Sequence, residues 1–251
     1  LNVVLGYTLF AGASVVLVQR FDPSTALETF AERGVTVVPG APQVWSALAQ
    51  MPCNECAVLS KLRVALTGAA KMPVHVTVQL KEQYGLVVHE GYGLTESSPV
   101  VTTSVNGSHK VGSIGKPLHG VSIRLVDEHG DDAEEGDSGE IWVRGENVFA
   151  GYYNDQEATD RVLTADGWLR TGDIAVRDAD SDLFLVDRLK DLIIVSGFNV
   201  YPAEVEQVLL AHSAIEQGAV VGVSHPHTGE AVRAYVVLHK GVHLDEESII
   251  E

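Results

Sequence analysis

The segment GYGLTE at residues 91–96 places an aromatic ring, a hydroxyl and a carboxylate beside two glycines. It follows an apolar run at residues 86–88, which predicts a buried strand. The glycines allow the backbone to turn sharply and to approach a ligand closely. The ring of Tyr92 suits stacking on a base, whereas Thr95 and Glu96 suit phosphate oxygens and a hard cation such as Mg²⁺. The alternative is a glycine turn that leaves a core strand. Glu96 stands where a dinucleotide fingerprint needs a third glycine, which excludes that fingerprint.

Three other groups of reactive side chains do not form convincing sites. Cys53 and Cys56 form a C-x-x-C pair with no second pair, so we expect two reduced thiols rather than a zinc site or a redox pair. DADSD at residues 178–182 is similar to a calcium loop, but Leu183 replaces the required glycine, so we expect a hairpin turn. HPH at residues 225–227 has no further ligand at zinc spacing, which favours a surface loop.

Composition indicates a folded protein with an acidic surface. Hydrophobic residues make up 45% of the 251 residues, enough for a sizeable core. The net charge of −17 disfavours nucleic acid and anionic membranes as partners. Residues 1–19 carry no charge, but Gly6 and Gly12 interrupt them, so we expect a core helix and then a buried strand at residues 14–18, not a transmembrane segment. With no basic leader, we expect no signal peptide and a cytoplasmic protein.

Both ends indicate an internal fragment of a longer protein. The chain begins without Met inside an apolar segment, and it stops within a helix start at residues 245–251.

Helices and strands alternate over the first hundred residues, which predicts a mostly parallel α/β sheet. Helix starts are expected at Asp22-Pro23, Pro42 and near Pro73, and strands at residues 35–38, 64–66 and 86–88. Ligands on such sheets lie at the carboxyl ends of the strands. The segments TGAA at residues 67–70 and GYGLTE both occupy such positions.

The predicted pattern of helices and strands changes after Glu96 and again from Asp187. Short strands at residues 121–126, 139–144 and 183–186, with a helix cap at 154–157, predict an antiparallel sheet or small β-barrel. After the charged segment DRLKD at 187–191, a small α+β unit is expected. We therefore predict three parts: a partial α/β subdomain at residues 1–100, a β-barrel-like subdomain at 101–187, and a partial C-terminal mobile domain at 188–251.

Five motifs in a fixed order resemble the adenylate-forming (ANL) superfamily, in particular its acyl-CoA synthetases. They are TGAA at 67–70, GYGLTE at 91–96, GEIWVRG at 139–145 with GYY at 151–153, WLRTGD at 168–173, and DRLKD at 187–191 with SGFNVYPAEVE at 196–206. The resemblance covers the whole chain, but not the whole length of the family's proteins.

The resemblance implies a nucleotide site. Gly68, Ala69 and Ala70 would form the loop between the adenine and acyl sites, and Tyr92 would stack on the base. Asp173 would accept hydrogen bonds from both ribose hydroxyls, and Arg188 would contact ribose or phosphate. The nucleotide-binding set implied in this way is Gly68, Ala69, Ala70, Gly91, Tyr92, Gly93, Thr95, Asp173 and Arg188.

The resemblance also implies catalytic roles. Thr95 would donate to the phosphates, and Glu96 would bind Mg²⁺ and so offset charge on the reacting phosphate. Lys190 sits at the family's hinge position. Gly197 would lie beside the tunnel for the pantetheine of CoA.

Each of these roles has a structural alternative. Asp173 alone could cap a turn, Arg188 and Lys190 could form a solvated linker, and Gly197 could serve a tight turn.

The implied function is that of an ATP-dependent acid–CoA ligase, acting on a fatty acid with ATP, Mg²⁺ and CoA. Nothing in the chain matches the family's upstream phosphate loop or its downstream Gly-Lys motif, so we expect these 251 residues to be inactive alone. Lys71 stands where the family more commonly has proline. The alternatives are an adenylation domain that loads a carrier protein, and a non-catalytic nucleotide-binding or interaction fragment.

Overall fold

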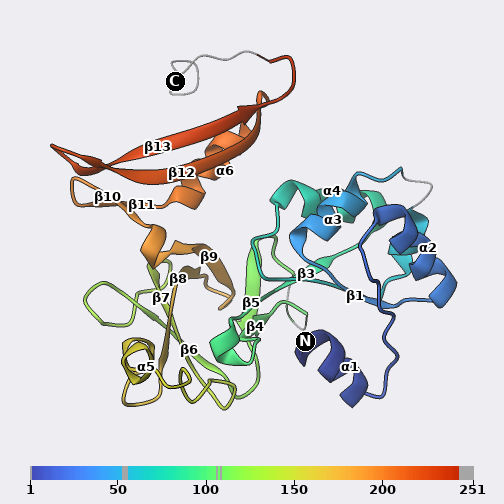
Figure 1. The fold of residues 1–251 in the computed structure, drawn as a ribbon, viewed down its shortest axis with the longest axis horizontal. Coiled ribbons are helices and arrows are strands. Elements are labelled where there is room, and N and C mark those ends of the chain that lie inside the picture. Colours follow the sequence, from blue (N-terminus) through green and yellow to red (C-terminus); the bar gives the residue numbers. More distant parts are fainter. Residues whose placement is uncertain (1, 53–55, 106, 108, 243–251) are drawn as a thin grey trace.

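The computed structural model describes residues 2–52, 56–105, 107 and 109–242 of the protein. The described strands form a nine-stranded sheet, in the order β1-β2-β3-β4-β5-β9-β8-β7-β6, and a four-stranded sheet, in the order β11-β10-β13-β12 (Figure 1). Cys53 and the expected helix start at residues 245–251 lie outside the described residues.

The nine-stranded sheet begins with three parallel strands and three helices packed on them. The bounds are Pro23–Arg33 (α2), Val37–Pro39 (β1), Pro42–Ala49 (α3), Val64–Thr67 (β2), Val74–Tyr84 (α4) and Val88–Tyr92 (β3). Asp22 caps α2 by accepting a hydrogen bond from the Thr25 amide at 2.9 Å, and Gly34 ends α2 in the left-handed region. Trp45, Leu48 and Leu80 are fully buried between these helices and the strands.

The same sheet continues without a break into antiparallel strands. These are Thr102–Thr103 (β4), Ser113–Pro117 (β5), Ser122–Val126 (β6), Ser138–Arg144 (β7), Leu169–Arg177 (β8) and Leu183–Arg188 (β9), with α5 at Gln156–Val162. The expected fold class is confirmed. The described strands run in an open order, however, so this portion is a sheet and not a closed barrel. Its core includes Ile141, Val143 and Leu169.

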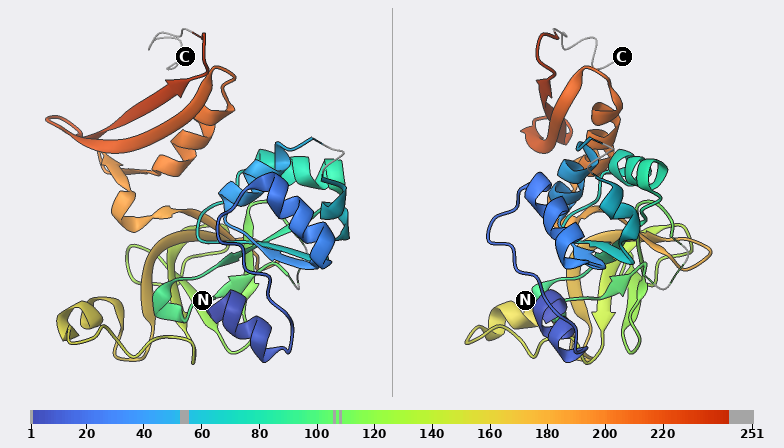
Figure 2. Two further views of the ribbon diagram at one scale, coloured as in Figure 1. Left: turned by 45° about the vertical axis from the view of Figure 1, so that its right-hand side comes forward. Right: turned by 90° about the vertical axis from the view of Figure 1, so that its right-hand side faces the viewer.

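A second, smaller sheet has its own core. Its elements are Ile193–Val195 (β10), Phe198–Val200 (β11), Pro202–Ala211 (α6), Ile215–His225 (β12) and Gly229–Leu238 (β13). Ile193, Leu209 and Val220 pack together there. A single 3-10 turn, η4 (Leu189–Asp191), connects it to β9, and the left view of Figure 2 shows the smaller sheet set apart from the larger one. The three-part division stays a prediction. The nine-stranded sheet runs across the boundary that was expected near residue 100.

The expectation for residues 1–19 is wrong. A π-helix at Asn2–Gly6 and α1 (Tyr7–Phe10) are followed by irregular backbone, with no strand at residues 14–18 (Figure 1). Phe10 is 89% exposed and Leu17 81% exposed. Apolar composition indicates burial only where another element covers the segment, and in the described part of the chain none does. No helix in the described ranges is long and apolar enough to cross a membrane.

The acidic segment at residues 178–182 forms the hairpin turn that the sequence predicts. Asp178 Oδ1 accepts from the amides of Asp180 and Asp182, and Lys110 Nζ lies 2.6 Å from Asp180 Oδ2. The ammonium group of Lys110 therefore pairs with the carboxylates of this turn. The described residues contain no group of three or more metal-ligating side chains.

Candidate active site

Two predicted site residues, Tyr92 and Arg188, each contact a third, Asp173. Tyr92, at the end of β3, donates its hydroxyl hydrogen bond to Asp173 Oδ2 at 2.7 Å. Arg188 Nε lies 3.1 Å from Asp173 Oδ1, since Asp173 on β8 and Arg188 on β9 face each other in the strand register. Tyr92 and Asp173 are each only 8% exposed. The Asp173 carboxylate is thus held on both oxygens.

The backbone around Asp173 is held as firmly as its side chain. Thr171 Oγ1 accepts from the Asp173 amide at 3.1 Å and donates to the Ile141 carbonyl at 2.8 Å. The Glu140 carboxylate accepts from the Gly172 amide at 2.9 Å, at an irregularity of the β7–β8 pairing. Burial, reinforced by the charge of Asp173, raises the pKa of the Tyr92 phenol far above its ordinary value. The phenol therefore stays protonated and remains the donor at neutral pH.

Glu96 follows Tyr92 by four residues and lies in the 3-10 turn η3 (Thr95–Ser97). Its Oε1 accepts a hydrogen bond from the Tyr152 hydroxyl at 2.7 Å, and its carbonyl accepts one from the Phe149 amide at 2.8 Å. Thr95 is exposed and Glu96 half-buried. Sequence reasoning missed Tyr152 as a partner of Glu96; the signal was its place in the GYY motif.

The TGAA loop lies beside GYGLTE, as the parallel topology predicts. A Cβ added to Gly68 would stand 3.2 Å from the carbonyl oxygen of Gly91, which leaves little room for a side chain. Ala69 adopts a left-handed backbone with φ of +70°. The exposed Ala69 and Ala70 therefore form a small-residue surface next to the end of β3.

Glu90, which sequence reasoning also missed, is a buried carboxylate on β3 beneath this loop. Burial raises the pKa of its carboxyl, against hydrogen bonds from the Met72 and Gly112 amides and the charge of Lys71, which lower it. Nothing in the sequence distinguishes Glu90 from an exposed strand residue, because its burial depends on strands that follow later in the chain.

Two predicted residues do not join this group. Lys190 is exposed in η4, and Gly197 lies in the turn between β10 and β11. Gly197 has φ of +85°, and no atom lies within 4 Å of an added Cβ. Among the described residues, no hydrogen bond or ion pair links either of them to Tyr92, Glu96 or Asp173. The tight-turn alternative for Gly197 therefore fits its backbone.

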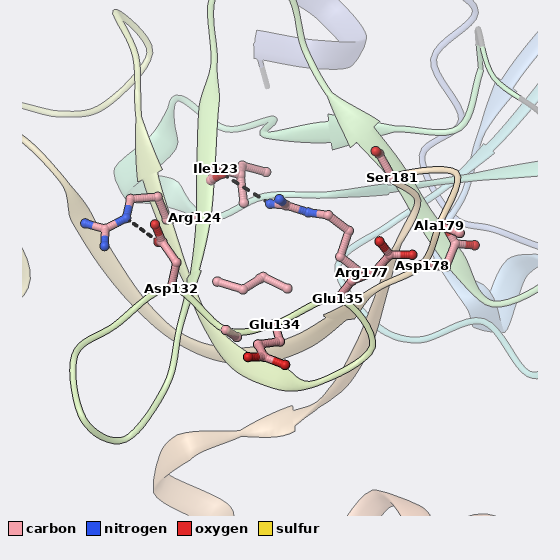
Figure 3. A pocket seen from close by; sticks show the side chains of 11 residues that line it. Ile123, Arg124, Asp132, Glu134, Glu135, Arg177, Asp178, Ala179 and Ser181 are labelled. Atoms are coloured by element: carbon pink, nitrogen blue, oxygen red, sulfur yellow. Dashed lines mark hydrogen bonds and ion pairs between the residues drawn. The ribbon is translucent and has the colours of Figure 1, made fainter.

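A cavity of about 340 Å³ lies elsewhere, between β6 and the β8–β9 turn (Figure 3). Its wall carries charges of both signs: Arg124 pairs with Asp132 at 2.6 Å, Arg177 donates to the Ile123 carbonyl, and Glu134 lies nearby. It includes none of the predicted site residues, so it is separate from the candidate active site.

The residues present fit a magnesium ion held mainly by phosphates. Mg²⁺ in nucleotide sites commonly takes one or two carboxylates and completes its shell with water and phosphate oxygens. Glu96 supplies one half-buried carboxylate four residues after Tyr92, and the described residues offer no larger ligand set.

The fold and the motif order define the class of protein. Residues 1–153 match the AMP-binding enzyme family, and residues 204–251 match the AMP-binding enzyme C-terminal domain. The chain therefore belongs to the AMP-binding enzymes, the adenylate-forming superfamily that its motifs resemble.

Two curated relatives and one solved structure show which members of the family the chain is similar to. The chain is 38% identical over 251 residues to a long-chain-fatty-acid–CoA ligase of Bacillus subtilis, covering 99% of this chain and 45% of the relative. It is 39% identical to a feruloyl-CoA synthase of an Amycolatopsis species, covering 97% and 50%. ATP-bound MatB from Rhodopseudomonas palustris superimposes with a TM-score of 0.90 at 35% identity, over 97% of this chain and 48% of that one. The chain spans about half the length of these relatives.

Proposed function

We propose that the protein carrying this chain is a cytoplasmic ATP-dependent acid–CoA ligase. The acid attacks the α-phosphate of ATP to give an acyl-adenylate and pyrophosphate, and the sulfur of CoA then displaces AMP. The observation that carries the proposal is the contact of Tyr92, Asp173 and Arg188, three residues that the family resemblance assigns to one nucleotide. Membership of the AMP-binding enzymes and the ATP-bound structural neighbour support it.

Each residue of the group has a role in this proposal. Asp173 accepts hydrogen bonds from the two ribose hydroxyls, and its fixed position lowers the entropy lost on binding. The permanent charge of Arg188 adjoins the ribose and phosphates. Thr95 donates to phosphate oxygens. Glu96 would hold Mg²⁺, which, when bound, supplies positive charge opposite the phosphate oxygens. Gly68, Ala69 and Ala70 keep space where the acyl group meets the nucleotide.

Nucleotide binding tests this proposal directly. Isothermal titration of the 251-residue chain with AMP should show binding, and Asp173→Ala should weaken it about 10- to 100-fold, the cost of losing hydrogen bonds to a charged group. Asp131→Ala is the matched control, because Asp131 is exposed in a turn between β6 and β7. Equal affinity of the Asp173→Ala variant and the unchanged chain would contradict the ribose role. Absence of binding would indicate a structural remnant without a nucleotide site.

We propose a fatty acid as the acid, supported by the long-chain-fatty-acid–CoA ligase among the relatives. The feruloyl-CoA synthase makes an aromatic acid the rival. Pyrophosphate release by the whole protein with a long-chain fatty acid and with ferulate separates the two, since the true substrate should give the larger kcat/KM. Pyrophosphate release without thioester formation after addition of CoA would favour the carrier-loading alternative.

A further inference from the structure

The segment at residues 149–152 is joined to Glu96 at two points. The Phe149 amide donates to the Glu96 carbonyl at 2.8 Å, and the Tyr152 hydroxyl donates to Glu96 Oε1 at 2.7 Å. The rings of Phe149 and Tyr152 meet edge to face, with centroids 4.9 Å apart. One segment therefore fixes both the backbone and the carboxylate of a residue more than fifty positions earlier.

Tyr152 is itself anchored on its far side. Its amide donates to Thr159 Oγ1 at 2.9 Å, and that hydroxyl donates to the Asp155 carbonyl at 2.8 Å, at the start of α5. The preceding Gly151 has φ of +139°, and an added Cβ would stand 2.8 Å from the Thr159 side chain. Only glycine allows the backbone to pass this close to α5, so the direction of Tyr152 toward Glu96 is built into the chain.

We propose that Tyr152 is a positioning residue that holds the Glu96 carboxylate ready for a divalent cation bound with the nucleotide. This inference rests on the proposed function, in which Glu96 faces Mg²⁺. The phenol is a neutral donor, so it orients one carboxylate oxygen without cancelling the charge that attracts the cation. A carboxylate already restrained loses less side-chain entropy when the cation binds.

The phenol keeps its proton throughout the neutral range. An ordinary tyrosine phenol loses its proton only at about pH 10. Tyr152 therefore acts as a donor and not as a second anion. The neighbouring Tyr153 is 93% exposed, so the chain offers a matched control one residue away.

The test compares Tyr152→Phe with Tyr153→Phe in the full 251-residue chain. Mn²⁺, as a paramagnetic probe in place of Mg²⁺, is titrated in the presence of ATP and followed by electron paramagnetic resonance. Calorimetry with AMP in the absence of metal gives the nucleotide affinity alone. Tyr152→Phe should weaken the binding of Mn²⁺ about tenfold, because it removes a hydrogen bond to a side chain that binds the metal. It should leave metal-free AMP affinity unchanged, and Tyr153→Phe should change neither quantity.

Glu96→Gln separates the possible failures. If Glu96→Gln weakens Mn²⁺ but Tyr152→Phe does not, the inference about Tyr152 is overturned while the metal role of Glu96 stands. If Tyr152→Phe weakens the binding of AMP without metal as much as it weakens the binding of Mn²⁺, the role of Tyr152 is structural and the inference is again overturned. If Glu96→Gln leaves Mn²⁺ binding unchanged, or the chain binds no Mn²⁺ with ATP, the metal role and the inference fall together.

Discussion

Asp173 and Glu90 are both buried carboxylates near the end of β3, but their partners differ in kind. Asp173 faces a guanidinium and a phenol, so a cation stabilises its charge. Burial raises the pKa of Glu90, and it outweighs the hydrogen bonds from backbone amides and the charge of Lys71, which lower that pKa. The Asp173 carboxylate is therefore paired with a cationic side chain, whereas Glu90 is buried with no ion pair among the described residues.

Glu90→Gln should change how stability depends on pH. Because folding raises the pKa of Glu90, its contribution is fully present below the ordinary Glu range and is lost as pH rises through the folded-state pKa. Relative to the unchanged chain, Glu90→Gln should thus become progressively more stable as pH rises from the ordinary Glu range of about 4 through the raised folded-state pKa. Urea unfolding at several pH values measures this. The exposed Glu82→Gln is the control, and parallel pH profiles for all three proteins would refute the assignment.

Gly93 is required for close approach rather than for an unusual backbone angle. An added Cβ would stand 1.8 Å from the Pro99 carbonyl oxygen, which is a backbone atom that cannot rotate away. Gly93→Ala should therefore lower the free energy of unfolding by about 3 kcal/mol or more, at the upper end of overpacking effects. Gly218→Ala is the control, since its Cβ would meet only the Leu209 side chain at 3.8 Å. Urea unfolding distinguishes the two, and similar values for both would be the contrary result.

At the scale of elements, the sequence predicts what local chemistry decides. The start of α2 at Asp22-Pro23, its end at Gly34 and the start of α3 at Pro42 agree with the structure, because caps and proline act within one turn. The hairpin turn at residues 178–182 agrees for the same reason.

Long-range pairing sets what the sequence does not predict. The expected strand at residues 86–88 is displaced: β3 begins at Val88 and runs through Tyr92, because Gly91 and Tyr92 pair with β4. The order of the motifs predicted that Tyr92, Glu96 and Asp173 belong to one nucleotide site. The hydrogen bonds from Tyr92 to Asp173 and from Tyr152 to Glu96 join positions 81 and 56 residues apart, which neither spacing nor periodicity can reveal.

At the scale of the whole molecule, the candidate site adjoins the connection between the two sheets. Arg188 contacts Asp173 and is also the last residue of β9, directly before η4. Contacts between the two bodies include the Ala203 amide with Asp187 Oδ2 at 2.9 Å, and the hydroxyls of Ser138 and Tyr201 at 3.2 Å. The hinge assigned to Lys190 stays a prediction, and such a rotation would have to break these two hydrogen bonds.

Separate cores predict that the two bodies lose structure separately. Ile141 and Ile193 are almost completely buried, the first in the nine-stranded sheet and the second in the four-stranded sheet. Replacing either residue with Ala should lower the free energy of unfolding of the body that contains it by about 2–5 kcal/mol and leave the other body unaffected. Hydrogen exchange followed by mass spectrometry should show faster exchange after Ile141→Ala in β6 to β8, and after Ile193→Ala only in β10 to β13. Each variant is the other's control. Equal acceleration over the whole chain in both variants would show a single cooperative unit and would place the boundary at Arg188 in error.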